Sequence, residues 1–342
     1  MWIDVKTLVI AFVLSFAFVT LAESADDDLA TRAKQVFGQL PKVMESDKNP
    51  VTPEKVKLGK ILFYETRISS DGTVSCSKCH PFSLYGADGL PKAIGNQCKI
   101  NQRNSPTVLN AAGQISAHWI GNRTGVEDQA KQSVTGPASF GMPSYAAVEK
   151  KLGEIGYGPL FKEAFPGDVN AVTIDNFAKA IGAFERTLVT PSPFDAFLAR
   201  NQQALNEREK KGLKTFMDVG CSGCHSGVYA GGQMYMKFGL IESYWKYTKS
   251  EPVDNGRYEV TKEESDKFVF KVPMLRNVEK TSPYFHDGSV GSLEQAEWIM
   301  GKIQIGRELS KEELGDINAF LKSLTGEIPR DALVVPLLPS NE

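Results

Sequence analysis

The sequence has no surplus of positive charge, few cysteines and a single long apolar run. Lys plus Arg number 39 and Asp plus Glu number 41, which gives a formal charge of −2. Nucleic-acid binding is therefore not expected, because it usually requires a basic surplus. Five cysteines are too few, and odd in number, for a fold held by disulfides. The 342 residues, 42% of them apolar, predict a folded protein of about two domains.

The long apolar run covers residues 8–22 at the N-terminus. It is shorter than the roughly 20 residues that cross a bilayer, and its length is typical of the centre of a secretory signal. Ala22 and Ser24 offer small residues for cleavage. We therefore expect a signal peptide over 1–24 and a mature protein in the periplasm, with an uncleaved N-terminal anchor as the alternative. No later run is long enough to span a membrane.

Four of the cysteines form two identical patterns, C-x-x-C-H, at 76–80 and 221–225. This pattern is typical of haem c attachment, in which the thiols add to the porphyrin vinyl groups and the histidine becomes the proximal iron ligand. A thioredoxin-like pair does not need the histidine, and a zinc site would bring all four thiols together. The sequence predicts two haem c groups, held by Cys76, Cys79, His80, Cys221, Cys224 and His225. The fifth cysteine, Cys98, is expected to be a small buried apolar residue.

An internal repeat accompanies the two haem patterns. Segments 54–63 and 207–216 each contain Glu, then Gly five residues later, then Phe four residues after that, just before a haem pattern. Segments 181–188 and 317–324 share apolar positions at i, i+3 and i+7, which predicts one buried helix face in each. Each half is therefore expected to run as helix, haem loop, long connection and closing helix.

The repeat predicts a mainly α fold of two cytochrome c-like haem domains in tandem. The expected ranges are 25–190 for the N-terminal domain and 191–342 for the C-terminal domain, because two prolines end the first closing helix near residue 191. The second closing helix should begin with a capping box formed by Ser310 and Glu313. Residues 231–271 are expected to be loop, with at most a short hairpin.

Further landmarks occur in a fixed order between residues 35 and 330. They are Arg103-Asn-Ser-Pro-Thr-Val-Leu-Asn110, Phe184-Glu-Arg-Thr-Leu188, Phe270-Lys-Val-Pro273, Leu275-Arg-Asn277 and Pro283-Tyr-Phe-His-Asp-Gly-Ser289. With the haem patterns, they make the chain resemble the bacterial dihaem cytochrome c peroxidases, a family that also contains the MauG-type enzymes. The resemblance implies peroxide reduction at the N-terminal haem and electron entry at the C-terminal haem. It also implies a small c-type cytochrome or cupredoxin as donor, an interdomain calcium ion, and a homodimer as one assembly state.

The same resemblance assigns residues around the C-terminal haem and between the haems. Met300 falls at the axial methionine, where a thioether raises the potential and closes the iron to other ligands; the alternative is a core methionine. A tyrosine there would indicate the MauG-type branch. Trp119 falls at the tryptophan between the haems, a candidate electron relay that can also be a core residue. The calcium positions are Asn104, Thr281 and Pro283, with oxygen donors suited to a hard cation.

The N-terminal distal site departs from the family pattern. Asn96 stands where the peroxidases carry a distal histidine, and Ser139 stands where they carry a catalytic glutamate, while Gln129 is retained. Neither replacement titrates near neutral pH, so neither can move a proton between the two peroxide oxygens. His118 is the nearest uncommitted histidine and the candidate substitute base; a solvated or core-edge histidine is the alternative.

Two classes of function remain after these departures. The first is a peroxidase-type oxidoreductase of low activity. The second is a dihaem electron-transfer or small-ligand-binding cytochrome that keeps the fold without efficient peroxidase activity. A MauG-type oxidase acting on a protein is a third, which Met300 disfavours. The residues at the site must decide between them, because the fold is common to all three.

Overall fold

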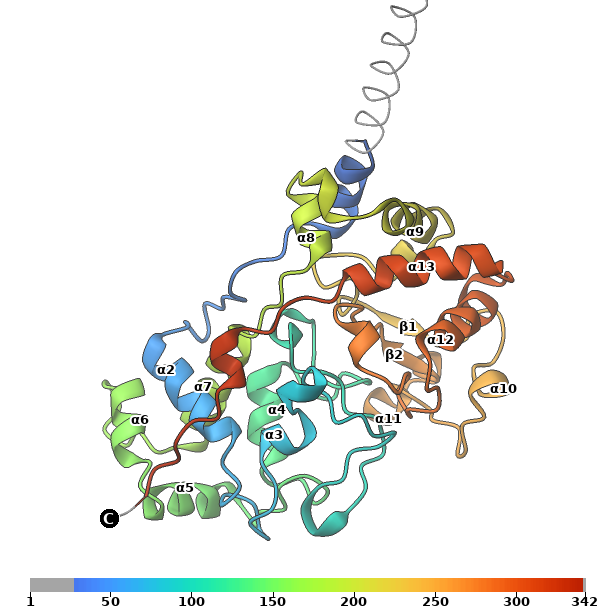
Figure 1. The fold of residues 1–342 in the computed structure, drawn as a ribbon. Coiled ribbons are helices and arrows are strands. Elements are labelled where there is room, and N and C mark those ends of the chain that lie inside the picture. The colour runs from blue at the N-terminus through green and yellow to red at the C-terminus, as the bar shows by residue number, and fades with distance from the viewer. Residues whose placement is uncertain (1–27, 341–342) are drawn as a thin grey trace, which may run out of the picture.

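The computed structural model describes residues 28–340, and it divides into two mainly helical lobes (Figure 1). The signal peptide expected over 1–24 lies outside the described residues. Within 28–340, no helix is long and apolar enough to cross a membrane.

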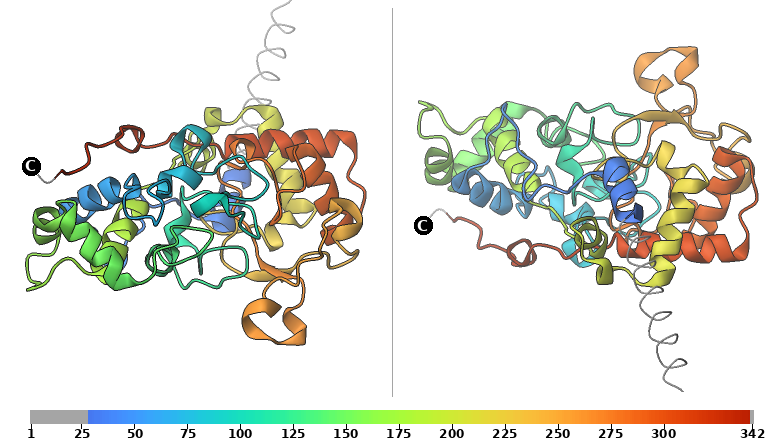
Figure 2. Two further views of the ribbon diagram at one scale, coloured as in Figure 1. Left: turned by 90° about the horizontal axis from the view of Figure 1, so that it is seen from below. Right: turned by 90° about the horizontal axis from the view of Figure 1, so that it is seen from above.

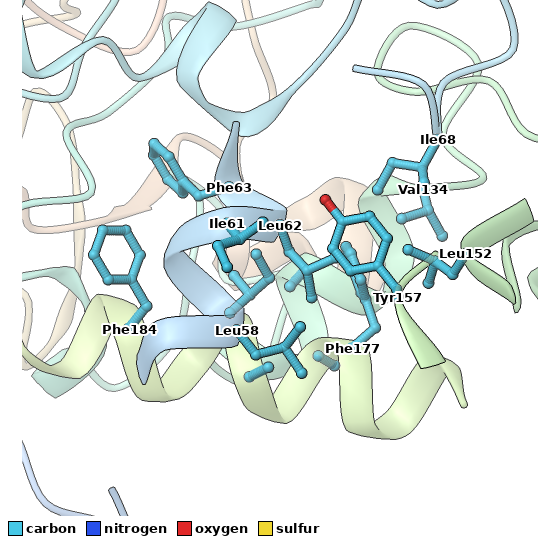
Figure 3. Close-up of a cluster of buried hydrophobic side chains, with 14 of the residues drawn as sticks. Leu58, Ile61, Leu62, Phe63, Ile68, Val134, Leu152, Tyr157, Phe177 and Phe184 are labelled. Carbon is cyan, nitrogen blue, oxygen red and sulfur yellow. The ribbon is translucent and has the colours of Figure 1, made fainter. Parts of the chain in front are cut away.

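The first lobe is built around two crossing helices, α2 and α7. Their side chains form the apolar core of this lobe, with Leu58 and Leu62 of α2 packed against Phe177 and Phe184 of α7 (Figure 3). The helices of this lobe are α2 (Pro53–Phe63), α3 (Cys76–Cys79), α4 (Val126–Ser133), α5 (Tyr145–Glu154), α6 (Gly158–Ala164) and α7 (Ile174–Arg186).

The second lobe repeats this plan with α9 crossing α13. Its helices are α8 (Pro193–Leu198), α9 (Glu207–Asp218), α10 (Trp245–Thr248), α11 (Tyr258–Thr261), α12 (Leu293–Met300) and α13 (Lys311–Ser323). Strands β1 (Tyr235–Lys237) and β2 (Val269–Lys271) pair antiparallel, with Tyr235 opposite Lys271. The expected loop at 231–271 therefore contains a small sheet whose strands are far apart in the chain. The capping box of Ser310 and Glu313 is confirmed at the start of α13.

The glycines of the sequence repeat lie where the helices cross. A Cβ atom on Gly59 would lie 1.9 Å from the Ala180 carbonyl oxygen, and one on Gly212 would lie 1.9 Å from the Asp316 carbonyl oxygen. Only glycine lets the two backbones approach so closely. The repeat therefore marks the same helix crossing twice, and the mainly α fold of two cytochrome c-like lobes is confirmed.

The ends of the chain cross between the lobes. A helix over 28–37 packs its Phe37 into the core of the second lobe, with ring centroids 5.2 Å from Phe194. The C-terminal tail returns to the first lobe, where Ala332 is buried and Lys60 pairs with Asp331 at 3.0 Å (Figure 2). Residues 28–37 and Asp331–Ala332 thus each contact the lobe formed by the other half of the chain. The domain ranges 25–190 and 191–342 stay a prediction.

Candidate functional site

The first haem pattern lies on α3 and the turn that follows it. The His80 backbone N–H donates to the Cys76 carbonyl at 3.0 Å, which closes the turn around both thiols. The His80 ring places Nδ1 3.0 Å from the Gly86 carbonyl oxygen. With Nδ1–H donated to this carbonyl, Nε2 is left as the free lone pair that an iron ligand requires.

The second pattern forms an equivalent turn in the other lobe. The His225 N–H donates to the Cys221 carbonyl at 3.0 Å, and the ring is buried. Burial lowers the pKa of His225 to about 4, against the opposing effect of the Ala230 and Pro273 carbonyls. A buried neutral imidazole fits an iron-bound state.

The thiols lie in two separate lobes and are held in the protonated form. Burial raises the pKa of Cys79 to about 11 and that of Cys221 to about 12. In the described part of the chain, no group of three or more His, Cys, Asp or Glu side chains is arranged to hold a metal ion. These environments suit thioether formation with two separate haems better than a shared thiolate site.

The two haem patterns predict the number of covalently bound haem groups. Replacing both Cys221 and Cys224 with Ala should remove one covalently bound haem and leave the other, because the first pattern is complete in its own lobe. Mass spectrometry of the exported protein measures this. The Cys98→Ala variant is the control and should keep two haems; a single haem in the unchanged protein would contradict the assignment.

Met300 ends α12 in the second lobe and is partly buried. A short π-helical turn, Gly301–Ile305, follows it directly. Such turns are rare and often occur at functional positions. Axial ligation by Met300 stays a prediction.

Glu297 is a buried carboxyl on the same helix. Its Oε1 accepts from Asn318 Nδ2 at 2.9 Å, and its Oε2 has no partner within the described residues. Burial raises the pKa of Glu297 to about 8; Glu294 adds to this shift, while Asn318 and Lys322 oppose it. The carboxyl is therefore held mainly in its neutral form near pH 7.

This raised pKa predicts a pH-dependent stability. The folded state holds the proton more tightly than the unfolded chain, so the stability due to Glu297 is complete below about pH 4.5 and is lost as the pH approaches 8. Glu297→Gln keeps the Asn318 hydrogen bond but cannot ionise. The free energy of unfolding should therefore fall by roughly 3 kcal/mol less between pH 5 and 8 in this variant than in the unchanged protein. Urea unfolding at both pH values measures this. Glu263→Gln, at an exposed residue of the same lobe, is the control, and equal pH profiles for unchanged protein and Glu297→Gln would contradict the prediction.

The structure brings Asn96 and Ser139 together. The buried Asn96 donates its backbone N–H to the Ser139 carbonyl at 2.9 Å, and its Oδ1 accepts from Ser70 Oγ at 2.8 Å. The Ser139 N–H donates to the Gly136 carbonyl at 2.9 Å, which fixes the loop after α4. The residues at these two positions are thus neighbours and are neutral at all ordinary pH values.

His118 is partly buried against Asn122, in the segment that precedes Trp119. Burial lowers its pKa to about 4, and the charges of Arg123, Lys271 and His80 add to the shift. Its Nδ1 lies 3.0 Å from Asn122 Oδ1. Within residues 28–340, no hydrogen bond or ion pair joins His118 to Asn96 or Ser139. Its role as a substitute base stays a prediction, without support from proximity to the other two.

Trp119 lies at the junction of the lobes. Its Nε1 donates to the Asn104 carbonyl at 2.9 Å, and its own carbonyl accepts from the Lys271 N–H at 2.7 Å. Its ring centroid is 6.5 Å from that of His286 in the second lobe. This position fits the predicted place between the haems. Gln129 lies on α4, partly buried in the first lobe.

Asn104, one of the predicted calcium residues, also lies at this junction. The Asn104 N–H donates to the His286 carbonyl at 2.7 Å, which joins this asparagine to the segment 281–286 that contains Thr281 and Pro283. Asn104 Nδ2 donates to the Leu90 carbonyl, so Oδ1 remains as a free acceptor. Oxygen is the donor type that calcium prefers, and calcium binding by Asn104, Thr281 and Pro283 stays a prediction.

The expectation of a buried Cys98 is wrong. Cys98 is exposed, with φ +58°, in a projecting loop whose base is a bridge between Ile94 and Ile100. An apolar residue type predicts burial only on average, and the loop path decides it here.

Sequence reasoning missed two buried charges near the haem patterns, Lys271 and Glu185. Burial raises the pKa of Glu185 to about 8, and this carboxyl lies near the Cys76 thiol. A charged residue inside an apolar segment, as in Val269-Phe-Lys-Val272, is the sequence feature that could have predicted such a buried charge.

The fold and the two C-x-x-C-H turns define a dihaem c-type cytochrome. Comparison with known proteins agrees: a family model for di-haem cytochrome c peroxidase matches residues 53–203. Cytochrome c551 peroxidase of Pseudomonas aeruginosa is 41% identical over 97% of this chain and 94% of its own length. The Nitrosomonas europaea enzyme of that name is also 41% identical, over 84% of this chain and 85% of its own. The chain belongs to the dihaem cytochrome c peroxidase family, and that family membership implies two haem c cofactors.

Other relatives show the breadth of the family. The methylamine utilization protein MauG of Methylorubrum extorquens is 33% identical over 95% of this chain and 92% of its own. Among solved structures, a MauG-like protein associated with microbial copper homeostasis superposes with a TM-score of 0.77 at 27% identity, covering 87% of this chain and 97% of that one. The diheme peroxidase BthA from Burkholderia thailandensis shares the fold, with a TM-score of 0.67 at 17% identity over 89% and 97%.

Proposed function

We propose that this protein reduces hydrogen peroxide slowly at the N-terminal haem, with electrons delivered through the C-terminal haem. The observation that carries the proposal is the combination of two complete haem patterns with the Asn96–Ser139 pair at the distal positions. The haems supply the oxidation-reduction chemistry, and the chain supplies access, orientation and protons. Trp119, hydrogen-bonded at the lobe junction, is the proposed relay between the haems.

The distal residues explain the low rate. The Asn96 amide and the Ser139 hydroxyl can hydrogen-bond to a peroxide, but neither exchanges a proton readily near neutral pH. Cleavage of the O–O bond needs a group that takes a proton from one oxygen and returns it to the other. Binding is therefore retained while the proton transfer is left to water.

The supply of electrons and the location follow the family resemblance. We propose a small c-type cytochrome or a cupredoxin as donor, export to the periplasm, and calcium at Asn104, Thr281 and Pro283. The proposal needs no nucleic acid and no membrane span after signal cleavage; a homodimer is the assembly to test first.

The same distal pair favours a second candidate function, a dihaem electron-transfer or small-ligand-binding cytochrome. Steady-state peroxide turnover by the reduced, haem-loaded protein separates the two. Turnover that is slow but saturable, and lower than that of the Pseudomonas aeruginosa relative, supports the peroxidase. Ligand binding with no turnover above that of free haem supports the second candidate.

Ligation by Met300 has its own test. Met300→Ala should lower the midpoint potential of the C-terminal haem and open it to added ligands, because a thioether stabilises the reduced iron and fills its sixth position. Spectroelectrochemistry measures both effects. Met217→Ala, a partly buried methionine of the same lobe, should change neither. An unchanged potential and low-spin spectrum in Met300→Ala would rule out ligation.

A further inference from the structure

Lys271 is a buried lysine that extends from the second lobe into the first. It ends strand β2 and is only 6% exposed. Its Nζ donates to the Ser116 carbonyl at 2.8 Å and to Gln114 Oε1, both in the first lobe. Both acceptors are neutral, so they satisfy hydrogen bonds without balancing the charge.

No carboxylate of residues 28–340 forms an ion pair with Lys271. Burial alone lowers its pKa, to about 7. Removing an ammonium from water without a counter-charge is costly, and buried lysines are normally paired or neutral. By contrast, the buried Arg276 of the second lobe forms a two-fold ion pair with Asp195 at 2.7 and 2.8 Å. The environment of Lys271 therefore lacks an anion.

Lys271 is connected to the first haem pattern through hydrogen bonds. Its backbone N–H donates to the Trp119 carbonyl at 2.7 Å, and Trp119 Nε1 donates to the Asn104 carbonyl at 2.9 Å. The neighbouring Ser105 Oγ donates to the Cys79 carbonyl at 3.3 Å. Pro273 is two residues after Lys271, and its carbonyl raises the pKa of His225 in the second pattern. Lys271 is thus a buried cation without a carboxylate partner at the point where the lobes meet.

We propose that Lys271 binds a propionate carboxylate of the N-terminal haem, so that the second lobe supplies a counter-charge to the haem of the first. The propionates are the anionic groups of haem c, and a carboxylate matches the remaining N–H of the ammonium in charge and geometry. The hydrogen bonds that run from Lys271 through Trp119 and Ser105 to Cys79 favour the haem of the first lobe. The proposal requires haem attachment but does not depend on peroxidase activity.

The proposal predicts a change in potential that a structural role would not produce. A cation near the haem disfavours its oxidised state, so Lys271→Met should lower the midpoint potential of the N-terminal haem and leave that of the C-terminal haem nearly unchanged. Lys237→Met is the matched control, since Lys237 is an exposed residue of the paired strand. Lys271→Arg should restore most of the potential. A folded, dihaem Lys271→Met protein with an unchanged N-terminal potential would overturn the proposal.

A second measurement covers the case in which Lys271→Met does not fold. A crystal structure of the haem-loaded, unchanged protein should place a propionate oxygen of the N-terminal haem within about 3.2 Å of Lys271 Nζ. An Nζ that contacts only Ser116 and Gln114, or a propionate of the C-terminal haem instead, would contradict the assignment.

Discussion

Ser139→Glu is expected to raise peroxide turnover by about 10²–10⁴-fold, the usual contribution of a general acid–base group. The loop that carries Ser139 is anchored to the end of α4 by backbone hydrogen bonds from Ser139 to Gly136 and from Met142 to Val134. A longer side chain at this position therefore changes the chemistry without requiring a new backbone path. Steady-state turnover with a reduced donor measures the gain.

Ser139→Gln is the matched control for this experiment. Gln has the size of Glu and can hydrogen-bond, but it cannot carry a proton between the two peroxide oxygens. Equal rates for the two variants would show that proton transfer at residue 139 is not limiting. If the unchanged protein already matches relatives that have the glutamate, His118→Ala becomes the next variant, and loss of activity with both haem spectra intact would identify His118 as the base.

Gly59→Ala and Gly212→Ala should each destabilise the protein by about 3 kcal/mol or prevent its folding. The added methyl group would lie 1.9 Å from a carbonyl oxygen of the crossing helix in both lobes. Backbone atoms cannot move aside as a flexible side chain can, so the helices must separate and uncover the core beside them. Thermal unfolding and the yield of dihaem protein measure the effect.

The control for these variants is Gly153→Ala in α5. Gly153 is exposed, and an added Cβ would meet no atom within 4 Å. Alanine should stabilise this helix by about 0.5–1 kcal/mol, because glycine has the greater conformational entropy to lose. Equal stability of Gly59→Ala and Gly153→Ala would show that the helix crossing in the first lobe is not as close as described.

The local chemistry of the haem patterns and the helix crossings was predictable from the sequence. The C-x-x-C-H spacing sets the thiols and the histidine on one turn, and each turn is closed by a backbone hydrogen bond that depends only on neighbouring residues. The Glu, Gly and Phe repeat marked the crossing of α2 with α7 and of α9 with α13, because a close approach of two helices requires glycine at a fixed place in each half.

Only the tertiary structure decided what lies beside these patterns. It brought Asn96 to Ser139, put His118 against Asn122 instead, and exposed Cys98. It also crossed the chain ends between the lobes. These outcomes depend on loop paths and on contacts between segments far apart in the chain, which no short-range spacing encodes.

The buried charges also depend partly on the sequence and partly on the tertiary structure. A lysine in an apolar strand is visible in the sequence, but its neighbours are not. The strand pairing of β1 with β2 and the junction at Trp119 determine that Lys271 reaches Ser116 and Gln114 rather than a carboxylate. The sequence by itself determined the family and the two haem patterns, since each rests on residue identity at a fixed spacing. The replacement of the distal acid–base residues stays a prediction. The tertiary structure determined the charge balance between the lobes, because electrostatic interaction depends on distance in space.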